Sequence, residues 1–377
     1  MKRLFSVILF STLFIACKEQ FKSTYQTPEG LNDGWEVSNL SKPGIDTLLI
    51  TELVSEIQSN RFNNIDALLI VKDGKLVLDE YFNGYDVKTK HKLWSCTKSF
   101  SSALIGIAIE QGEIKSEKDS IVAYLGKYGT PIDENKKEIS IKNVLEMGTG
   151  IKWEGDLSKS GRKLPYAQDM VAYTLELPQE HQAGKIFQYS SANSMLLAPI
   201  IFNATGQQAH EFAKETLFKD LGIEHYQWDR QAEFWTRTAG NEIPAEKPNI
   251  EYDREYAELT NTATGLWMLP RDMCKLGQLY LNKGNWKGKS IIPTAWVEKS
   301  TKEQIKGSNY GLHWKLMKIG NFETFYASGF GLQRIFVIPE LNSVIVFTQS
   351  WYHNQPKGNK QMMKILDEYI IKSIKSA

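Results

Sequence analysis

The 377-residue sequence predicts an α/β (α+β) protein in which an antiparallel sheet is flanked by terminal helices and interrupted by an inserted all-helical domain. Three observations support this prediction. Strand patterns gather near both ends of the chain, helical patterns fill the middle, and a helical pattern lies outside each group of strands. Because a sheet must bury a face against helices, strands at both ends of a helical segment indicate one sheet with an insertion.

The first part of the predicted sheet domain spans 44–112. Apolar residues at helical spacing from Ile45 to Ile57 predict a helix. Two apolar runs between Ala67 and Phe82, separated by a turn at Asp73-Gly74, predict a β-hairpin. A second helix is predicted to begin near Ser95 and to continue through an apolar stretch until Gly112.

The middle and the end of the chain complete this plan. Residues 113–270 contain short helical patterns separated by Gly, Pro and charged loops, which predicts the inserted helical domain. Strands return in the segment 271–377, which closes with a helix at about 360–374. The predicted strands cover 310–317, 322–327, 332–338 and 343–349.

The N-terminus has the pattern of an export signal. Two basic residues precede an apolar run from Leu4 to Ala16 that is too short to span a bilayer, so residues 1–16 are predicted to be a signal peptide. The junction Phe14-Ile15-Ala16-Cys17 resembles a bacterial lipobox, which implies lipidation of Cys17 and a tether over 17–43. We therefore expect a membrane-anchored lipoprotein of the cell envelope, facing the periplasm or the cell surface. The alternative is a simple signal peptide with an incidental cysteine.

The composition argues against several classes of function. A formal net charge of +1, without a basic stripe interleaved with aromatic residues, argues against a nucleic-acid partner. The six histidines are scattered, and neither H-E-x-x-H nor C-x-x-C occurs, so we expect no metal and no other cofactor. Apart from Cys17, only Cys96 and Cys274 remain, and these either form one disulfide or stay buried and reduced.

The first candidate for catalysis is Ser95, which is followed three residues later by Lys98. On a helix, positions i and i+3 share a face, so the two side chains can touch. A serine hydroxyl is a poor nucleophile until a neighbour takes its proton, and a partly buried lysine with a lowered pKa can do so. The alternative is an ordinary surface cap. A second S-x-x-K, from Ser160 to Lys163, lies in a polar loop with a glycine and is a poor helix start.

A second polar cluster surrounds Tyr189. A tyrosine beside a lysine ammonium can have its phenol pKa lowered and serve as a base or proton shuttle. Ser191 and Asn193 offer donors and acceptors that could orient Lys98 or a substrate carbonyl. The alternative is a tyrosine that packs at the start of a helix capped by serine.

Together these motifs resemble those of serine β-lactamase-like hydrolases, in particular class C β-lactamases, penicillin-binding esterases and 6-aminohexanoate-dimer hydrolases. The resemblance is carried by Ser95-x-x-Lys98 and Tyr189-x-Ser191-x-Asn193, and by the flanking phrases 141–153 and 264–273. It implies a β-lactamase/transpeptidase-like fold without a cofactor. It also implies that Ser95 is acylated and that Lys98 and Tyr189 transfer the proton.

The third family motif, usually Lys-Thr-Gly, corresponds here to Ala327-Ser328-Gly329, followed by Phe330. The resemblance implies that the backbone N–H of Phe330 stabilises the oxyanion together with that of Ser95. It also places Ser328 and Gly329 in the substrate site. Because the lysine would pair with a substrate carboxylate, Ala327 argues against β-lactams and peptidyl-D-alanine and favours neutral substrates.

The sequence therefore predicts a serine hydrolase that cleaves a small ester or amide through an acyl-enzyme. Two alternatives remain open. One is a true β-lactamase or D,D-peptidase, which Arg334 or another cation from a neighbouring strand would favour. The other is a noncatalytic cell-envelope binding protein with the same fold, although such a protein has no need of Ser95, Lys98 and Tyr189 together.

Overall fold

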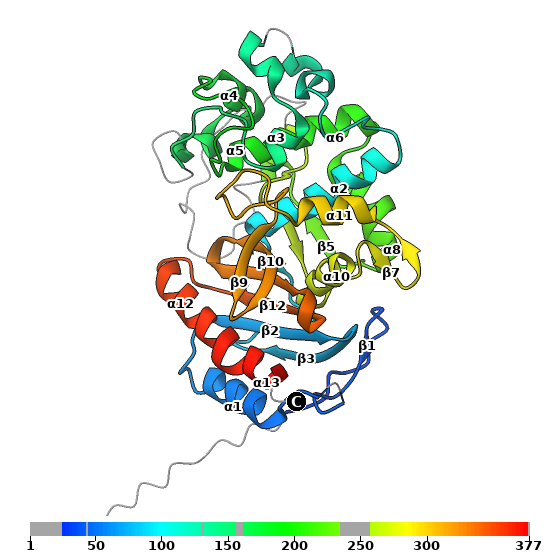
Figure 1. Ribbon diagram of the computed structural model, residues 1–377, viewed down its shortest axis with the longest axis vertical. Coiled ribbons are helices and arrows are strands. Elements are labelled where there is room, and N and C mark those ends of the chain that lie inside the picture. Colours follow the sequence, from blue (N-terminus) through cyan, green and yellow to red (C-terminus); the bar gives the residue numbers. More distant parts are fainter. Residues whose placement is uncertain (1–24, 43, 130–131, 156–160, 234–256, 376–377) are drawn as a thin grey trace, which may run out of the picture.

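The computed structural model describes residues 25–42, 44–129, 132–155, 161–233 and 257–375. The predicted signal peptide, Cys17 and Ser160 lie outside these ranges. At the centre is a seven-stranded sheet with the order β1-β3-β2-β12-β11-β10-β9, which Figure 1 shows between two layers of helices. The strands are β1 Glu36–Val37, β2 Ile65–Lys72, β3 Lys75–Tyr81, β9 Lys315–Ile319, β10 Phe322–Gly329, β11 Gln333–Ile338 and β12 Ser343–Gln349.

The sheet agrees with the prediction of strands at both ends of the chain. Neighbouring strands are antiparallel, except that β1 runs parallel to β3. β12 pairs with β2, so the last strand of the chain lies beside the first strand of the hairpin. The strand predicted at 310–317 is shorter than expected. It begins at Lys315, and Tyr310 takes part only in an isolated bridge.

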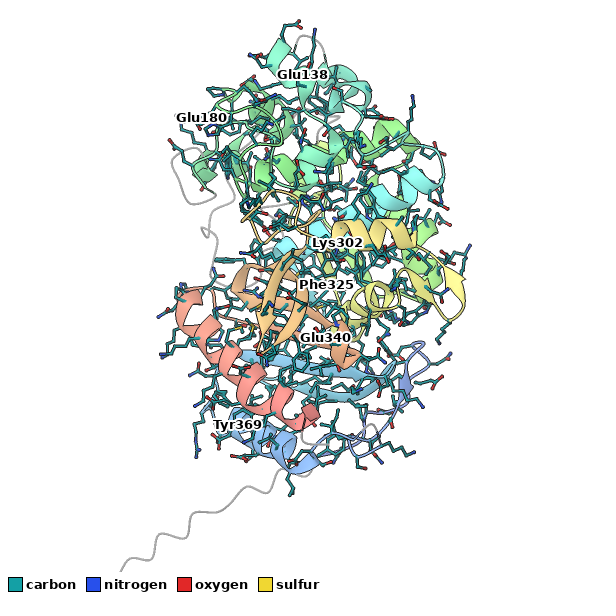
Figure 2. The ribbon with its side chains drawn as sticks, in the orientation of Figure 1. Glu138, Glu180, Lys302, Phe325, Glu340 and Tyr369 are labelled. Atoms are coloured by element: carbon teal, nitrogen blue, oxygen red, sulfur yellow. The ribbon has the colours of Figure 1, made fainter. Side chains whose placement is uncertain are left out.

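Terminal helices cover one face of the sheet (Figure 1). They are α1 Thr47–Gln58, α12 Gln355–Ile365, a π-helical turn Leu366–Ile371 and α13 Lys372–Lys375. Ile50 and Leu53 of α1 and Ile365 of α12 share a core with Ile70 and Phe347 of the sheet. Figure 2 shows Tyr369 at this end of the molecule, Phe325 in the sheet and Glu138 at the opposite end.

The other face of the sheet packs against α2 Thr97–Glu110 and α10 Pro270–Leu281. α10 lies close to the strands at Gly277, where an added Cβ would come within 2.5 Å of Val344. At the start of α10, the guanidinium of Arg271 donates to Asp79 of β3 and to Asp33 of the N-terminal segment. α2 is buried from Thr97 to Ala108, so its residues contact neighbours on every side.

The segment 113–270 is mainly helical, but it also contributes two strands that the prediction of an all-helical insertion missed. β5 Tyr226–Trp228 and β6 Leu266–Met268 form a small antiparallel sheet with β4 His91–Lys92. Strands of two or three residues leave no period in the sequence, and their pairing joins distant parts of the chain. The helices here are α3 Ile141–Leu145, α4 Met170–Glu176, α5 Ser191–Met195, α6 Leu197–Thr205, α7 Ala209–Ala213 and α8 Lys219–Leu221.

A short hairpin and one more helix follow α10. The hairpin is formed by β7 Asn285–Trp286 and β8 Lys289–Ser290, and the helix is α11 Thr294–Ser300. Gly106 allows α11 to approach α2, since an added Cβ would lie 2.5 Å from the ring of Trp296. In the described part of the chain, no helix is both long and apolar enough to cross a membrane.

Candidate active site

Ser95 lies in a short 3-10 turn, Trp94–Cys96, that leads directly into α2. The turn is held against the small sheet by a hydrogen bond from Leu93 N to Leu266 O, 2.8 Å long. Trp94 has a φ of +49°, a conformation that costs about 1–3 kcal/mol in a residue other than glycine. The surrounding contacts therefore force the backbone into one conformation at the residue before Ser95.

Lys98 contacts Ser95 as the i and i+3 spacing predicts. Its Nζ donates to Ser95 Oγ at 2.8 Å, to Ser191 Oγ at 3.3 Å and to the Ala263 carbonyl at 3.1 Å. The lysine is only 1% exposed. These contacts hold the amine within proton-transfer distance of the Ser95 hydroxyl.

The second polar cluster lies on the other side of the Lys98 amine. Ser190 caps α5 through its hydroxyl, which accepts from Asn193 N at 3.2 Å, and Ser191 is the first residue of this helix. The Tyr189 ring centroid is 5.4 Å from Lys98 Nζ. Asn193 is buried within α5. The structure thus brings Ser191 and Tyr189 to Lys98.

The end of β10 approaches the same turn. An added Cβ on Gly329 would lie 2.1 Å from the Leu93 carbonyl oxygen, so only glycine permits this distance. Phe330 follows directly, and its ring packs edge-on against Trp94 with centroids 5.4 Å apart. Ser328 is half-buried in β10. This arrangement brings the strand residues predicted for the substrate site close to the segment that carries Ser95.

Comparisons with known proteins identify the family of this chain. The family model described as Beta-lactamase matches residues 65–368. The chain belongs to the beta-lactamase family. Members of this family are serine hydrolases, and the predicted family and β-lactamase/transpeptidase-like fold are both confirmed.

Individual members of the family are distant in sequence. The 6-aminohexanoate-dimer hydrolase of Paenarthrobacter ureafaciens is 22% identical over 312 residues, which cover 76% of this chain and 72% of that protein. Protein flp of Staphylococcus aureus strain MW2 is 25% identical over 170 residues, 42% of this chain but about a third (34%) of that protein. The solved octameric penicillin-binding protein homologue from Pyrococcus abyssi has a TM-score of 0.63 at 18% identity, covering 87% of this chain and 78% of that one.

One contact in this beta-lactamase-family site was missed by the sequence analysis. The Ala263 carbonyl that accepts from Lys98 belongs to a polar turn, in which Asn261 Oδ1 accepts from the backbone N–H groups of Ala263 and Thr264. Thr262 Oγ1 donates to the Ser194 carbonyl of α5 at 2.7 Å. The sequence Asn-Thr-Ala-Thr-Gly is typical of such a turn, but only the fold reveals that its carbonyl faces the amine.

His313 and Cys96 are buried near the site. Burial, together with the charge of Lys98, lowers the pKa of His313 to about 3, so this imidazole is neutral at physiological pH. Burial raises the pKa of the Cys96 thiol to about 12, which makes it a poor nucleophile. Cys96 and Cys274 are both free and buried, which decides against the disulfide that the sequence left open. Within the described ranges, no three potential ligands form a metal-binding cluster.

Proposed function

We propose that this chain is a serine hydrolase that cleaves an ester or amide through an acyl-enzyme on Ser95. The observation that carries the proposal is the 2.8 Å contact between Ser95 Oγ and the buried Lys98 Nζ. A binding protein gains nothing from burying an amine beside a serine hydroxyl, since taking a polar group out of water costs free energy.

The mechanism follows from these contacts. Neutral Lys98, or Lys98 sharing a proton with Tyr189, accepts the hydroxyl proton as Ser95 Oγ attacks the substrate carbonyl. The backbone N–H groups of Ser95 and Phe330 donate to the oxyanion of the tetrahedral intermediate. The same proton then passes to the leaving alcohol or amine as its bond to the carbonyl carbon breaks. A water molecule, deprotonated by the same pair, hydrolyses the ester on Ser95 and restores the serine.

Replacement of the nucleophile tests this proposal. Ser95→Ala is expected to abolish hydrolysis of p-nitrophenyl acetate while leaving the circular dichroism spectrum and the melting temperature unchanged. Ser160→Ala, which alters the serine of the other S-x-x-K, is the matched control and should retain full activity. A fluorophosphonate adduct mapped by mass spectrometry should lie on the peptide that contains Ser95. Equal activity of Ser95→Ala and wild type, or an adduct on Ser160, would refute the assignment.

We also propose that the enzyme acts in the cell envelope, anchored through a lipid on Cys17. The support is the sequence pattern alone: a charged start, a short apolar run and Ala16 directly before the cysteine. Two acyl chains or more would hold such an enzyme firmly on a membrane. This location would give the site access to small esters or amides outside the cytoplasm.

A further inference from the structure

Lys315 lies at the point where β10 extends beyond its last pair with the neighbouring strand β9. β9 pairs with β10 from Ile319–Phe322 to Lys315–Tyr326, and Lys315 is the first residue of β9. β10 continues past this pair through Ala327 to Gly329, toward the turn that carries Ser95. Figure 1 shows β9 and β10 side by side along the sheet edge. Lys315 therefore pairs with Tyr326, the residue before Ala327, which stands where the third family motif usually has its lysine.

The ammonium group of Lys315 lies close to Tyr189, for which we propose a role in proton transfer. Its Nζ is 5.3 Å from the Tyr189 ring centroid, nearly the same distance as the 5.4 Å of Lys98 Nζ from that ring. Tyr189 therefore contacts two lysines that come from different layers of the fold. Within the described ranges, Lys315 takes part in no ion pair.

Arg334 adds a second positive charge from the opposite side of β10. It is paired with Ser328 in the sheet register and is 7% exposed. Its Nη1 donates to the carbonyls of Gly329 and Gln333, at 3.0 and 2.8 Å. Its Nε has no hydrogen-bond partner in the described part of the chain, and no acidic side chain there forms an ion pair with it. Arg334 is thus a buried cation held by neutral carbonyls.

The charges of these residues act together at the site. Burial, followed by the charge of Arg334, lowers the pKa of Lys315 to about 8, so the amine remains mostly protonated at neutral pH. Burial likewise lowers the pKa of Arg334. The rise in the Cys96 pKa that burial causes is opposed by the charges of Arg334, Lys315 and Lys98. The positive charges of Arg334 and Lys315 therefore act on Cys96, the residue next to Ser95.

Resting on the proposed function, we propose that Lys315, supported by Arg334, forms an anion subsite that selects ester or amide substrates bearing a carboxylate. Lys315 is half-buried and Arg334 is buried, and cations removed from water without an acidic partner are costly, so a substrate carboxylate supplies the missing partner. A lysine ammonium donates charge-assisted hydrogen bonds to such a group. Lys315, on the neighbouring strand, thus supplies the positive charge that a lysine at the position of Ala327 would supply in the family motif. This reverses the preference for neutral substrates that Ala327 alone predicts.

The test compares substrates that differ only in charge. One pair is 3-acetoxybenzoate, whose carboxylate lies on the leaving group, and its neutral methyl ester. The other is mono-4-nitrophenyl glutarate, whose carboxylate lies on the acyl group, and its neutral methyl ester. The readout is the ratio of kcat/KM for the anionic member to that for the neutral member. We expect the wild-type ratio to exceed one in at least one pair.

Lys315→Met should lower this ratio by about 10- to 100-fold, the range for a lost charge-assisted hydrogen bond. Lys315→Arg, which keeps the charge, should retain most of the ratio. The matched control is Lys318→Met on the same strand, because Lys318 is exposed and pairs with Glu323 at 2.7 Å. This control should keep the wild-type ratio.

Two results would overturn the inference. One is a wild-type ratio at or below one in both pairs, which needs no variant and therefore holds even if Lys315→Met fails to fold. The other is an unchanged ratio in folded Lys315→Met. The fate of the proposed function is separate: if Ser95→Ala is inactive while these ratios do not depend on Lys315, only the anion subsite is refuted.

Discussion

The close approach of β10 to the nucleophile segment leads to the sharpest prediction, for Gly329→Ala. Gly329 has a φ of −118°, so its backbone conformation suits alanine and the effect of the change is steric. The new Cβ would lie 2.1 Å from the Leu93 carbonyl oxygen, whereas an ordinary contact begins at 3.4 Å. The strand and the turn must therefore separate by the difference, about 1.3 Å, because the neighbouring atom belongs to the backbone and not to a flexible side chain.

A displacement of this size should affect catalysis more than folding. A misplacement of about 1 Å at a catalytic centre can cost about 100-fold in rate. Overpacking costs about 1–3 kcal/mol in stability, which a domain of this size can tolerate. We therefore expect kcat/KM for p-nitrophenyl acetate to fall by about 100-fold. Thermal unfolding should still be cooperative.

The assay needs a glycine control. Gly30→Ala is suitable, because the nearest atom to its added Cβ is a methyl group of Val37 at 3.9 Å. This variant should keep wild-type kinetics and stability. A folded Gly329→Ala with kcat/KM within threefold of wild type would refute the argument that the distance between β10 and the turn controls catalysis.

Further predictions concern the proton-transfer pair, the core and the anchor. Lys98→Ala and Tyr189→Phe should each lower the acylation rate by about 10²- to 10⁴-fold, measured by stopped-flow, and a change below threefold would contradict the pair. Arg271→Ala removes the partner of two carboxylates and should lower the free energy of unfolding in urea by about 3–5 kcal/mol. The exposed Arg61 is its control, with an expected loss below about 1 kcal/mol for Arg61→Ala, and equal losses would disprove the difference. Cys17→Ser should move the enzyme from the membrane to the soluble fraction, and unchanged membrane association would leave only an export signal.

Much of the site could be predicted from the sequence because its parts are local. Ser95 and Lys98 are three residues apart on one helix, so helical geometry alone brings their side chains together. The cluster at Tyr189 stands out because polar residues interrupt an apolar background at a helix start. Contact of Tyr189 and Ser191 with Lys98 was predicted from the residue types, and the structure shows it. That Asn193 orients Lys98 or a substrate carbonyl stays a prediction.

The strands and terminal helices were also determined locally. The hairpin turn at Asp73-Gly74, the apolar runs near the C-terminus and the apolar spacing of α1 each depend on neighbouring residues. Hydrophobic periodicity therefore indicates where the elements lie. It does not reveal strands of two or three residues, such as the pair β4 and β6, because these strands are too short to show a period.

The tertiary structure alone decided the charge of the site. Ala327 indicates that the lysine of the third family motif is missing. Nothing in the sequence near Ala327 shows that Lys315 supplies a positive charge instead. The two residues are 12 positions apart, and Lys315 lies beside this part of β10 only because β9 begins opposite Tyr326. The Ala263 carbonyl reaches Lys98 across 165 residues for the same reason. The sequence by itself determined the contact of Ser95 with Lys98 through a single helical turn, whereas strand register and long-range packing determined which other groups surround them.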